Sequence, residues 1–255
     1  MPLTEPDFEV RLAQDDAEIR AAQRLRYRVF VDELGGDGAL VDHAAGLESD
    51  EFDAAAKHLL LIDKAAGDAV VGVYRLMDAA GARQAGGYYS EEEYDLTVLR
   101  RGGRRLLELG RSCLHPDYRG GAGMFHLWTG LAALVAETGT DILFGTASFH
   151  GTDVQALAQP LTFLHRNHLA PPDLRVAARG ADAVSLDLLP PEAVDRRTAL
   201  LQIPALIKAY LRLGGAIGSG AWVDRQFNTI DVCLVMDTAR LNQRQSRLYA
   251  RAGAG

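Results

Sequence analysis

The sequence is poor in cysteine: its 255 residues include only Cys113 and Cys233, and both lie in apolar, strand-like runs. Two such thiols exclude a disulfide framework and a cysteine metal site, and they fit a reducing compartment. Long apolar runs are also missing, since none approaches the roughly 18 residues that a membrane span needs. The N-terminus does not resemble a signal peptide. We therefore expect a cytoplasmic protein, at most peripheral on the cytoplasmic face of the inner membrane.

A surplus of positive charge is absent as well. The chain has 27 Lys and Arg residues against 34 Asp and Glu residues, a formal net charge of -7, which argues against nucleic acid as a partner. The Gly-Lys-Ser/Thr of a P-loop, the G-x-G-x-x-G fingerprint, the EF-hand loop, H-E-x-x-H and the G-x-S-x-G elbow are all missing. We expect no metal site and no tightly bound cofactor.

What remains is an ordinary globular composition, 48% hydrophobic and 24% charged, long enough for one large domain. Hydrophobic periodicity, caps and breakers predict a mixture of strands and helices. The expected strands are 8–12, 57–63, 69–77, 105–114, 141–147, 183–188 and 229–236, and the expected helices are 15–33, 124–138, 153–169 and 202–213. This order indicates an α/β or α+β fold around one central mixed sheet flanked by helices.

A glycine-rich loop follows the strand at 105–114, in the stretch L-E-L-G-R-S-C-L-H-P-D-Y-R-G-G-A-G. A strand that leads through such a loop into a helix presents free backbone N–H groups and the positive end of the helix dipole. The loop residues that would face a phosphate are Arg119, Gly120, Gly121 and Gly123. A tight turn that simply needs glycine is an equally good interpretation of the spacing.

The second feature is an acidic stretch, L-E-S-D-E-F-D, with Glu48, Asp50, Glu51 and Asp53. Two arginines, Arg75 and Arg111, lie in apolar strands, where charges are rarely buried without a partner. We expect loop carboxylates and strand arginines to pair and to build a polar pocket suited to a zwitterion. Glu108 and Arg111 are three apart and would face opposite sides of a regular strand, so a bulge near Gly110 is needed to bring both to one pocket.

Two further polar features are less specific. A basic patch, Arg100, Arg101, Arg104 and Arg105, stands on an acidic chain, and it is either a solvated face or a landing site for an acidic partner. The stretch S-F-H-G-T-D at 148–153 contains Ser148 and His150 and is expected to be a turn after the strand at 141–147. Open α/β sheets place ligand-binding groups at such strand ends.

Several motifs occur together and in order: R-L-R-Y-R-V-F-V-D-E-L, L-E-S-D-E-F-D, V-Y-R-L-M, L-E-L-G-R-S-C-L-H-P-D-Y-R, F-G-T-A-S-F-H-G-T-D and I-K-A-Y-L-R-L-G-G-A-I-G. Over roughly 8–238 the chain resembles the ornithine N-acyltransferases of bacterial aminolipid synthesis, members of the GCN5-related N-acetyltransferase (GNAT) superfamily. The resemblance implies a GNAT-like domain over 1–240, with a core of about 8–150, a family-specific part of about 151–238, and a tail at 241–255 that we expect to be disordered.

Part of the pattern is similar to the acyl-homoserine-lactone synthases, a sister group. The resemblance implies that their R-x-x-x-F, E-x-D-x-x-D, R-L and E-x-x-R residues form or brace the active-site face. They fall on Arg26 and Phe30, on Glu48, Asp50 and Asp53, on Arg75, and on Glu108 and Arg111. The resemblance also implies an acyl donor carried on the phosphopantetheine of acyl carrier protein. Ala122 and Met124 stand where the superfamily's loop has glycine and a small residue, which favours one phosphodiester over a closely held pyrophosphate.

The implied reaction is attack of an amino acid's α-amine on the thioester carbonyl. We expect Glu108 or Glu48 to act as general base, with Asp50 holding the cationic groups of the substrate and Arg75 or Arg111 its carboxylate. Backbone amides of the strand 105–114 would stabilise the oxyanion. The expected substrate-binding set is Arg75, Arg26, Phe30, Asp53, Ser148 and His150.

Four alternatives stay open. The acceptor is ornithine by default, and glutamine or another amino acid would use the same motifs. The chain could be a homoserine-lactone synthase, or a non-enzymatic carrier-protein or lipid-binding module on an inactive fold. The amphipathic segment 202–213 is a candidate for transient membrane contact, and packing on the sheet explains its apolar face equally well.

Overall fold

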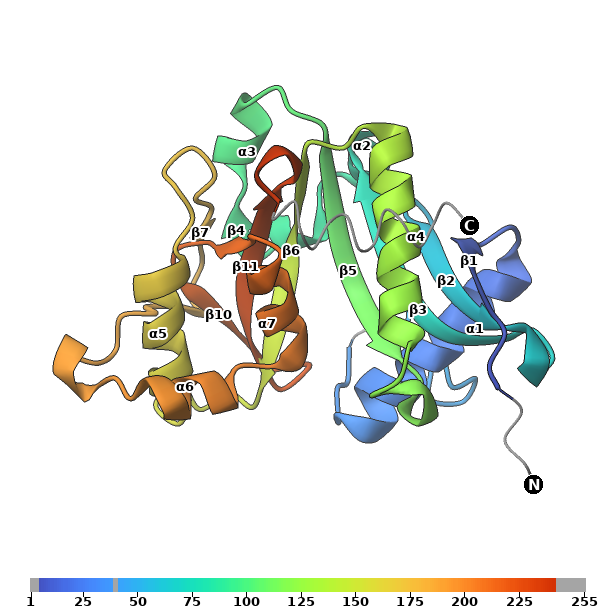
Figure 1. Ribbon diagram of the computed structural model, residues 1–255, viewed down its shortest axis with the longest axis horizontal. Coiled ribbons are helices and arrows are strands. Elements are labelled where there is room, and N and C mark those ends of the chain that lie inside the picture. Colours follow the sequence, from blue (N-terminus) through green and yellow to red (C-terminus); the bar gives the residue numbers. More distant parts are fainter. Residues whose placement is uncertain (1–4, 39–40, 242–255) are drawn as a thin grey trace. The chain divides into compact units, whose positions relative to one another are not determined.

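The computed structural model describes residues 5–38 and 41–241. They form two compact units, each built from separate stretches of chain (Figure 1). Of the described residues, the first unit contains those up to Gly86 together with Leu109–Gly139, and the second contains Gly87–Glu108 together with 140–241. The boundary near residue 150 that the sequence suggests lies inside the second unit. The end of the 241–255 tail, from residue 242 on, lies outside the described residues.

The first unit is a sheet with a helix on each face. The strands β1 (Phe8–Leu12), β2 (Lys57–Asp63) and β3 (Ala69–Asp78) are antiparallel neighbours, and the second half of β5 (Leu106–Leu114) lies beside β3. The helices α1 (Asp16–Arg26) and α4 (Gly123–Thr138) cover this sheet, with α4 in front and α1 behind in the view of Figure 1. A short helix, α2 (Ala79–Ala85), follows β3.

Alternation along the strands decides which residues face which helix. On the α1 side, the sheet and the helical segment together form a cluster of buried apolar residues: Ala22, Leu25, Val29, Leu60, Ile62, Val73 and Cys113. On the other face, α4 approaches the sheet so closely at Gly130 that an added Cβ would lie 2.2 Å from Val10 Cγ1. Trp128 on α4 donates a hydrogen bond of 3.0 Å to the hydroxyl of Tyr74 on β3. The two helices therefore pack on opposite faces of the sheet and contact different sets of core residues.

The helix that the sequence predicts over 15–33 is two elements. Asp15 caps α1 by accepting a hydrogen bond from the backbone N–H of Glu18. At Tyr27 the hydrogen bonding changes to a π-helix, Tyr27–Glu33. π-helices are rare in proteins, and those that occur are often found at functional sites. This one carries Phe30, which packs against the α1-side core cluster.

The second unit is centred on β6 (Ile142–His150) and β11 (Thr229–Asp237), which are antiparallel along their whole length. β6 also pairs in parallel with the first residues of β5, so this sheet is mixed as expected. On the far side of β11 lie β10 (Ala221–Asp224) and then β8 (Ala183–Val184), and β9 (Ala216–Ile217) also pairs with β11. β4 (Tyr94–Asp95) and β7 (Ala177–Ala178) form a separate two-stranded sheet.

Helices and turns complete the second unit. Its helices are α3 (Thr97–Arg101), α5 (Ala158–His168), α6 (Arg196–Gln202) and α7 (Ala205–Arg212). Short 3-10 turns over the described chain are Lys64–Ala66, Tyr89–Glu91, Pro116–Tyr118, Pro191–Ala193 and Thr238–Arg240. No helix in the described ranges is both long and apolar enough to cross a membrane.

Most predicted elements are confirmed, and four are corrected in addition to the helix at 15–33. The segment 148–150 belongs to β6, because its polar residues are the exposed positions of an alternating strand. α5 begins at Ala158 and not at 153. The strand expected at 183–188 is reduced to Ala183–Val184. The helix at 202–213 is α7 alone, and it packs on β11 with Ile207 and Tyr210 buried.

Candidate active site

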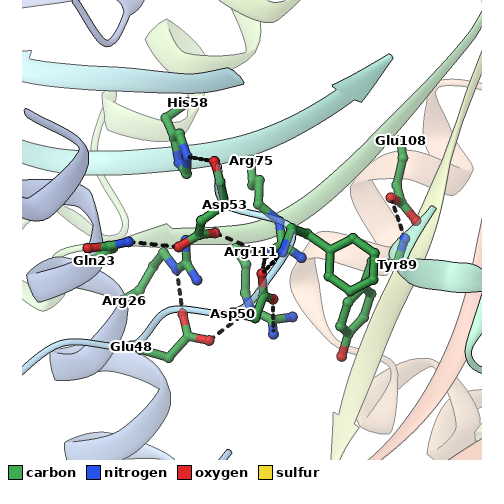
Figure 2. Close-up of polar contacts among 11 residues, drawn as sticks. Gln23, Arg26, Glu48, Asp50, Asp53, His58, Arg75, Tyr89, Glu108 and Arg111 are labelled. Carbon is green, nitrogen blue, oxygen red and sulfur yellow. Dashed lines mark hydrogen bonds and ion pairs between the residues drawn. The ribbon is translucent and has the colours of Figure 1, made fainter. Parts of the chain in front are cut away.

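Six charged side chains of the first unit converge in one buried cluster, which we call the charge ring. Arg26 is the last residue of α1, three carboxylates come from the loop before β2, and two arginines come from the strands (Figure 2). The members are Arg26, Glu48, Asp50, Asp53, Arg75 and Arg111. The expectation that loop carboxylates and strand arginines satisfy one another is confirmed.

The ring is closed, with arginines and carboxylates alternating around it. Arg26 bonds Glu48 through Nε, and its Nη1 lies 2.8 Å from Asp53 Oδ1. Arg75 uses Nη1 for both Asp50 and, at 3.0 Å, Asp53.

Arg111 completes the circuit, with Nε 3.0 Å from Glu48 Oε1 and Nη2 3.0 Å from Asp50 Oδ2. Three positive and three negative groups therefore neutralise one another, as buried charges require.

The backbone of β5 is distorted where it supplies Arg111. This residue has a φ of 49°, in the left-handed region that costs a non-glycine residue roughly 1 kcal/mol or more. The preceding Gly110 has no side chain and lies against the Arg75 guanidinium, so that an added Cβ would be 3.9 Å from Nε. The backbone therefore departs from regular strand geometry at the residue that closes the ring, and the bulge expected near Gly110 stays a prediction.

Burial and charge act in opposite directions on the ring carboxylates, and charge prevails. Burial alone would raise the pKa of Glu48, but Arg111 and Arg26 hold it below its usual range. Burial likewise opposes ionisation of Asp50, whose pKa is lowered by Arg75 and Arg111. The pKa of Asp53 is also lowered against burial, by Arg26 and Arg75. All three are ionised at neutral pH, so the ring carries its charges when folded.

A second set of side chains supports the ring. Gln23, one turn before Arg26 on α1, donates a hydrogen bond of 2.9 Å to Asp53 Oδ2, and its backbone carbonyl accepts from the N–H of Glu48. His58 Nε2 lies 3.3 Å from the carbonyl oxygen of Asp53, and burial lowers the pKa of this imidazole. The sequence interpretation missed both residues. The signal for Gln23 was its i, i+3 spacing from Arg26.

Access to the ring is uneven. The side chains of Arg26 and Glu48 are 0% and 1% exposed, whereas those of Asp50 and Arg111 are each 12% exposed. The accessible part of the ring is therefore one adjacent pair of opposite charges. Such a pair is complementary to a zwitterion, since a carboxylate can hold an ammonium and a guanidinium can hold a carboxylate.

Glu108 belongs to the second unit and caps a turn there. Its Oε2 accepts from the N–H of Tyr89 at 3.0 Å and its Oε1 from the N–H of Ser90 at 2.6 Å, as Figure 2 shows for Tyr89. Glu108 thus fixes the start of the 3-10 turn Tyr89–Glu91. That Glu108 and Arg111 line one pocket stays a prediction.

The glycine-rich loop leads into α4 as expected. Gly120 has a φ of 75°, which favours glycine, and an added Cβ at Gly121 would meet nothing within 4 Å. Gly123 is the first residue of α4, where a Cβ would come within 3.3 Å of the Tyr118 carbonyl oxygen. Arg119 is held by Glu33 at 2.5 and 2.7 Å, a partner that the sequence interpretation missed.

The basic patch is less basic than the sequence suggests, because three of its arginines have acidic partners. Arg100 pairs with Glu91, Arg104 with Asp237 at 2.6 Å, and Arg105 with Asp141 at 3.6 Å, while Arg101 is exposed. The patch precedes β5 and the glycine-rich loop follows it, so a nine-residue extended strand separates them in the chain.

Two predicted binding residues have a different setting. Ser148 and His150 do not lie in a turn: they are exposed positions of β6, opposite Asp231 and Thr229 of β11. Phe30 is part of the hydrophobic packing behind the ring and does not belong to the ring itself. In 5–38 and 41–241, no group of three or more His, Cys, Asp or Glu side chains is arranged to hold a metal ion.

Comparison with known proteins identifies the fold. The family model for the acetyltransferase (GNAT) domain matches residues 25–129, a range that contains all six ring residues. A solved CoA-dependent acyl-homoserine lactone synthase shares the fold, with a TM-score of 0.56 and 13% identity over 97% of this chain and 90% of its own. The fold is therefore a GNAT-like acyltransferase fold.

Closer relatives give the family. The L-ornithine N(alpha)-acyltransferase of Rhodobacter capsulatus is 56% identical over 97% of this chain and 96% of its own length. The protein of the same name from Brucella abortus is 42% identical over 95% of this chain and 88% of its own. The chain belongs to the L-ornithine N(alpha)-acyltransferase family.

Proposed function

We propose that this protein transfers a (3-hydroxy)fatty acyl group from acyl carrier protein to the α-amine of ornithine, giving a lyso-ornithine lipid. The observation that carries the proposal is the 56% identity to the Rhodobacter capsulatus L-ornithine N(alpha)-acyltransferase along 97% of the chain. The charge ring supports it, because its members are six of the seven charged residues in the motif pattern shared with the acyl-homoserine-lactone synthases, Glu108 being the seventh. The free amine forms the new amide bond while the carrier thiol leaves.

The accessible pair of the ring is the proposed amino acid site. Asp50 would bind the ammonium groups of the substrate, and Arg111 or Arg75 its carboxylate. Ion pairs already present in the free enzyme hold these side chains in place, so little side-chain entropy is lost when substrate binds. Ornithine carries a second ammonium that needs a further carboxylate. The exposed Glu51 of the same loop is the group that we assign to it.

The bound α-amine must lose a proton, because its pKa of about 8 keeps it mostly protonated at neutral pH. We assign the general base to Glu108 or Glu48, acting directly or through one water. Glu48 is the weaker candidate, since both of its oxygens accept from arginines and its pKa is lowered. Backbone amides of β5 would stabilise the oxyanion. The thiolate leaves readily and needs little acid assistance.

The donor site is assigned to Arg119 and the glycines of the loop, which would hold the phosphodiester of the phosphopantetheine arm. The exposed Arg101, together with Arg100, Arg104 and Arg105, would meet acidic residues of the carrier protein. The acidic partners of the last three weaken this contribution.

Transient contact with the cytoplasmic face of the inner membrane is assigned to α6. Its Leu201 side chain is 73% exposed beside exposed arginines, whereas the apolar face of α7 is used in packing.

Purified protein supplied with 3-hydroxyacyl-acyl carrier protein tests the function by release of carrier thiol across a panel of amino acids. We expect release with ornithine, and a product with the mass of N-acylornithine. Faster release with glutamine would reassign the acceptor. Release only with S-adenosylmethionine would indicate a lactone synthase. No release with any amine would leave the non-enzymatic module as the better explanation.

A further inference from the structure

The last residue of the π-helix, Glu33, forms an ion pair with Arg119 of the glycine-rich loop. Its two carboxylate oxygens lie 2.5 and 2.7 Å from Nη1 and Nη2 of Arg119. The Nε of the same guanidinium lies 3.2 Å from the carbonyl oxygen of Leu114. Arg119 is therefore fixed from both sides. The two side chains are 38% and 40% exposed, so a ligand arriving from solvent meets the acid and the arginine together.

Glu33 brings a full negative charge to this loop. The hydrogen bond from Arg119 lowers its pKa against partial desolvation, and the nearby Arg28 lowers it further. The charge of Arg119 is thus balanced before any donor binds. A phosphate that uses Arg119 must either share it with Glu33 at close range or displace the carboxylate. The free-energy cost of either event, sharing Arg119 or displacing Glu33, increases with the negative charge of the phosphate group.

We propose that Glu33 is a specificity-determining residue that selects a donor with a single phosphodiester and disfavours free coenzyme A. This inference rests on the proposed function, because it takes Arg119 as a contact to the donor phosphate. The arm of a carrier protein brings one singly charged phosphodiester. Coenzyme A brings a pyrophosphate and a ribose phosphate, so its repulsion from Glu33 is larger. The side chains of Ala122 and Met124 restrict close approach of a pyrophosphate to the backbone of the same loop. Glu33 adds electrostatic repulsion of its negative charge.

An opposite role for the same ion pair is physically reasonable. Glu33 could preorganise Arg119 and so help every phosphate to bind. The two roles predict changes of opposite sign in the use of coenzyme A when the charge at Glu33 is removed. Removing the charge at Glu33 increases the use of coenzyme A if the residue discriminates, and decreases the use of both donors if it only positions Arg119.

The test is the variant Glu33→Gln, which keeps the shape and removes the charge. The same acyl group is offered on acyl carrier protein and on coenzyme A, with saturating ornithine, and kcat/KM is measured for each donor. Removing a like charge about 6 Å from a phosphate is worth roughly three- to hundredfold. We expect kcat/KM for acyl-coenzyme A to rise by about tenfold and the value for the carrier protein to change less. An unchanged or increased preference for the carrier protein overturns the proposal.

The chain supplies a matched control in Glu18, which holds Arg11 through two hydrogen bonds of 2.6 and 2.7 Å. Glu18→Gln removes one charge from a pair that is also held by two hydrogen bonds, at the start of α1. Donor preference should stay as in the parent protein. An equal shift in Glu18→Gln would show a general effect of net charge and would also overturn the proposal.

Binding of unacylated coenzyme A, measured by calorimetry, separates this inference from the proposed function. We expect Glu33→Gln to bind coenzyme A more tightly than the parent, and the gain to disappear in Glu33→Gln with Arg119→Ala. This result does not require any acceptor to be acylated. If no amino acid is acylated while the binding gain is seen, the proposed function fails and the role of Glu33 stands. Weaker binding in Glu33→Gln, or no detectable binding by either protein, contradicts the inference.

Discussion

The guanidinium of Arg26 bonds the carboxylate of Glu48, and neither side chain has more than 1% of its surface exposed. This contact joins the end of α1 to a loop residue 22 positions later. Because Glu48 also accepts from Arg111, the pair links the helix, the loop and β5 in one circuit. Buried ion pairs of Glu48 therefore fix the loop that carries Asp50, the candidate substrate-binding carboxylate.

Replacing Arg26 by methionine should destabilise the protein strongly. The change leaves Glu48 and Asp53 buried with one guanidinium fewer, and breaking a buried pair in this way costs about 3–5 kcal/mol. Urea unfolding measures the loss. The matched control is Arg24→Met, at an exposed position of the same helix, which should change the free energy of unfolding by no more than about 0.5 kcal/mol. Equal losses in the two variants would show that the ring contributes little.

Two aspartates of the ring should respond differently to loss of charge. Asp50 is on the accessible side, so Asp50→Asn should raise KM for ornithine about tenfold or more, the value of a lost charge-assisted hydrogen bond. Asp53 bonds Arg26, Arg75 and Gln23 in the interior. Asp53→Asn should lower stability while changing KM less than Asp50→Asn does. The reverse order would move the amino acid site away from Asp50.

Much of this arrangement was predictable because it follows from local rules. Strands β1, β2 and β3 have alternating or buried apolar residues bounded by turns, and their predicted limits agree with the structure to within one residue. The pairing of Arg75 with loop carboxylates follows from the cost of burying an unpaired charge.

Other features depend on contacts that no short pattern contains. Arg111, which closes the ring, has a left-handed backbone that no sequence pattern marks. The partner of Arg119 is 86 positions away in sequence.

The errors also have physical reasons. Ser148 and His150 are polar enough to suggest a turn, but they alternate with Phe149, which is buried, and so continue the period of β6. Ile207 and Tyr210 formed an amphipathic pattern that suits a membrane surface or a protein core equally well. In the structure they pack on β11. Periodicity identifies an apolar face and does not identify what covers it.

Stability should fall in acid because of the ring. The pKa values of Glu48, Asp50 and Asp53 are lowered by folding, so the unfolded chain binds protons first as the pH decreases. The contribution of these groups is complete above their unfolded pKa values of about 4, and it is lost as the pH falls through the lower, folded values. Urea midpoints measured between pH 7 and pH 3 should decrease below about pH 4.5. The decrease should be smaller in Arg26→Met, and an equal decrease would assign it to other carboxylates.

Replacing Glu108 by glutamine separates a catalytic from a purely structural carboxylate. Glutamine keeps one carbonyl oxygen but presents an NH2 group to the second backbone N–H, so the turn at Tyr89 and Ser90 should lose about 1–3 kcal/mol. If Glu108 is the general base, kcat should also fall by roughly 10²–10⁴-fold. The matched control is Glu91→Gln, because Glu91 accepts from the N–H of Tyr88 in the same turn. It should cost similar stability and leave kcat within about threefold, well below the loss expected for a base. A kcat of Glu108→Gln close to that of the control would remove Glu108 from the chemistry and leave it as the cap of the turn.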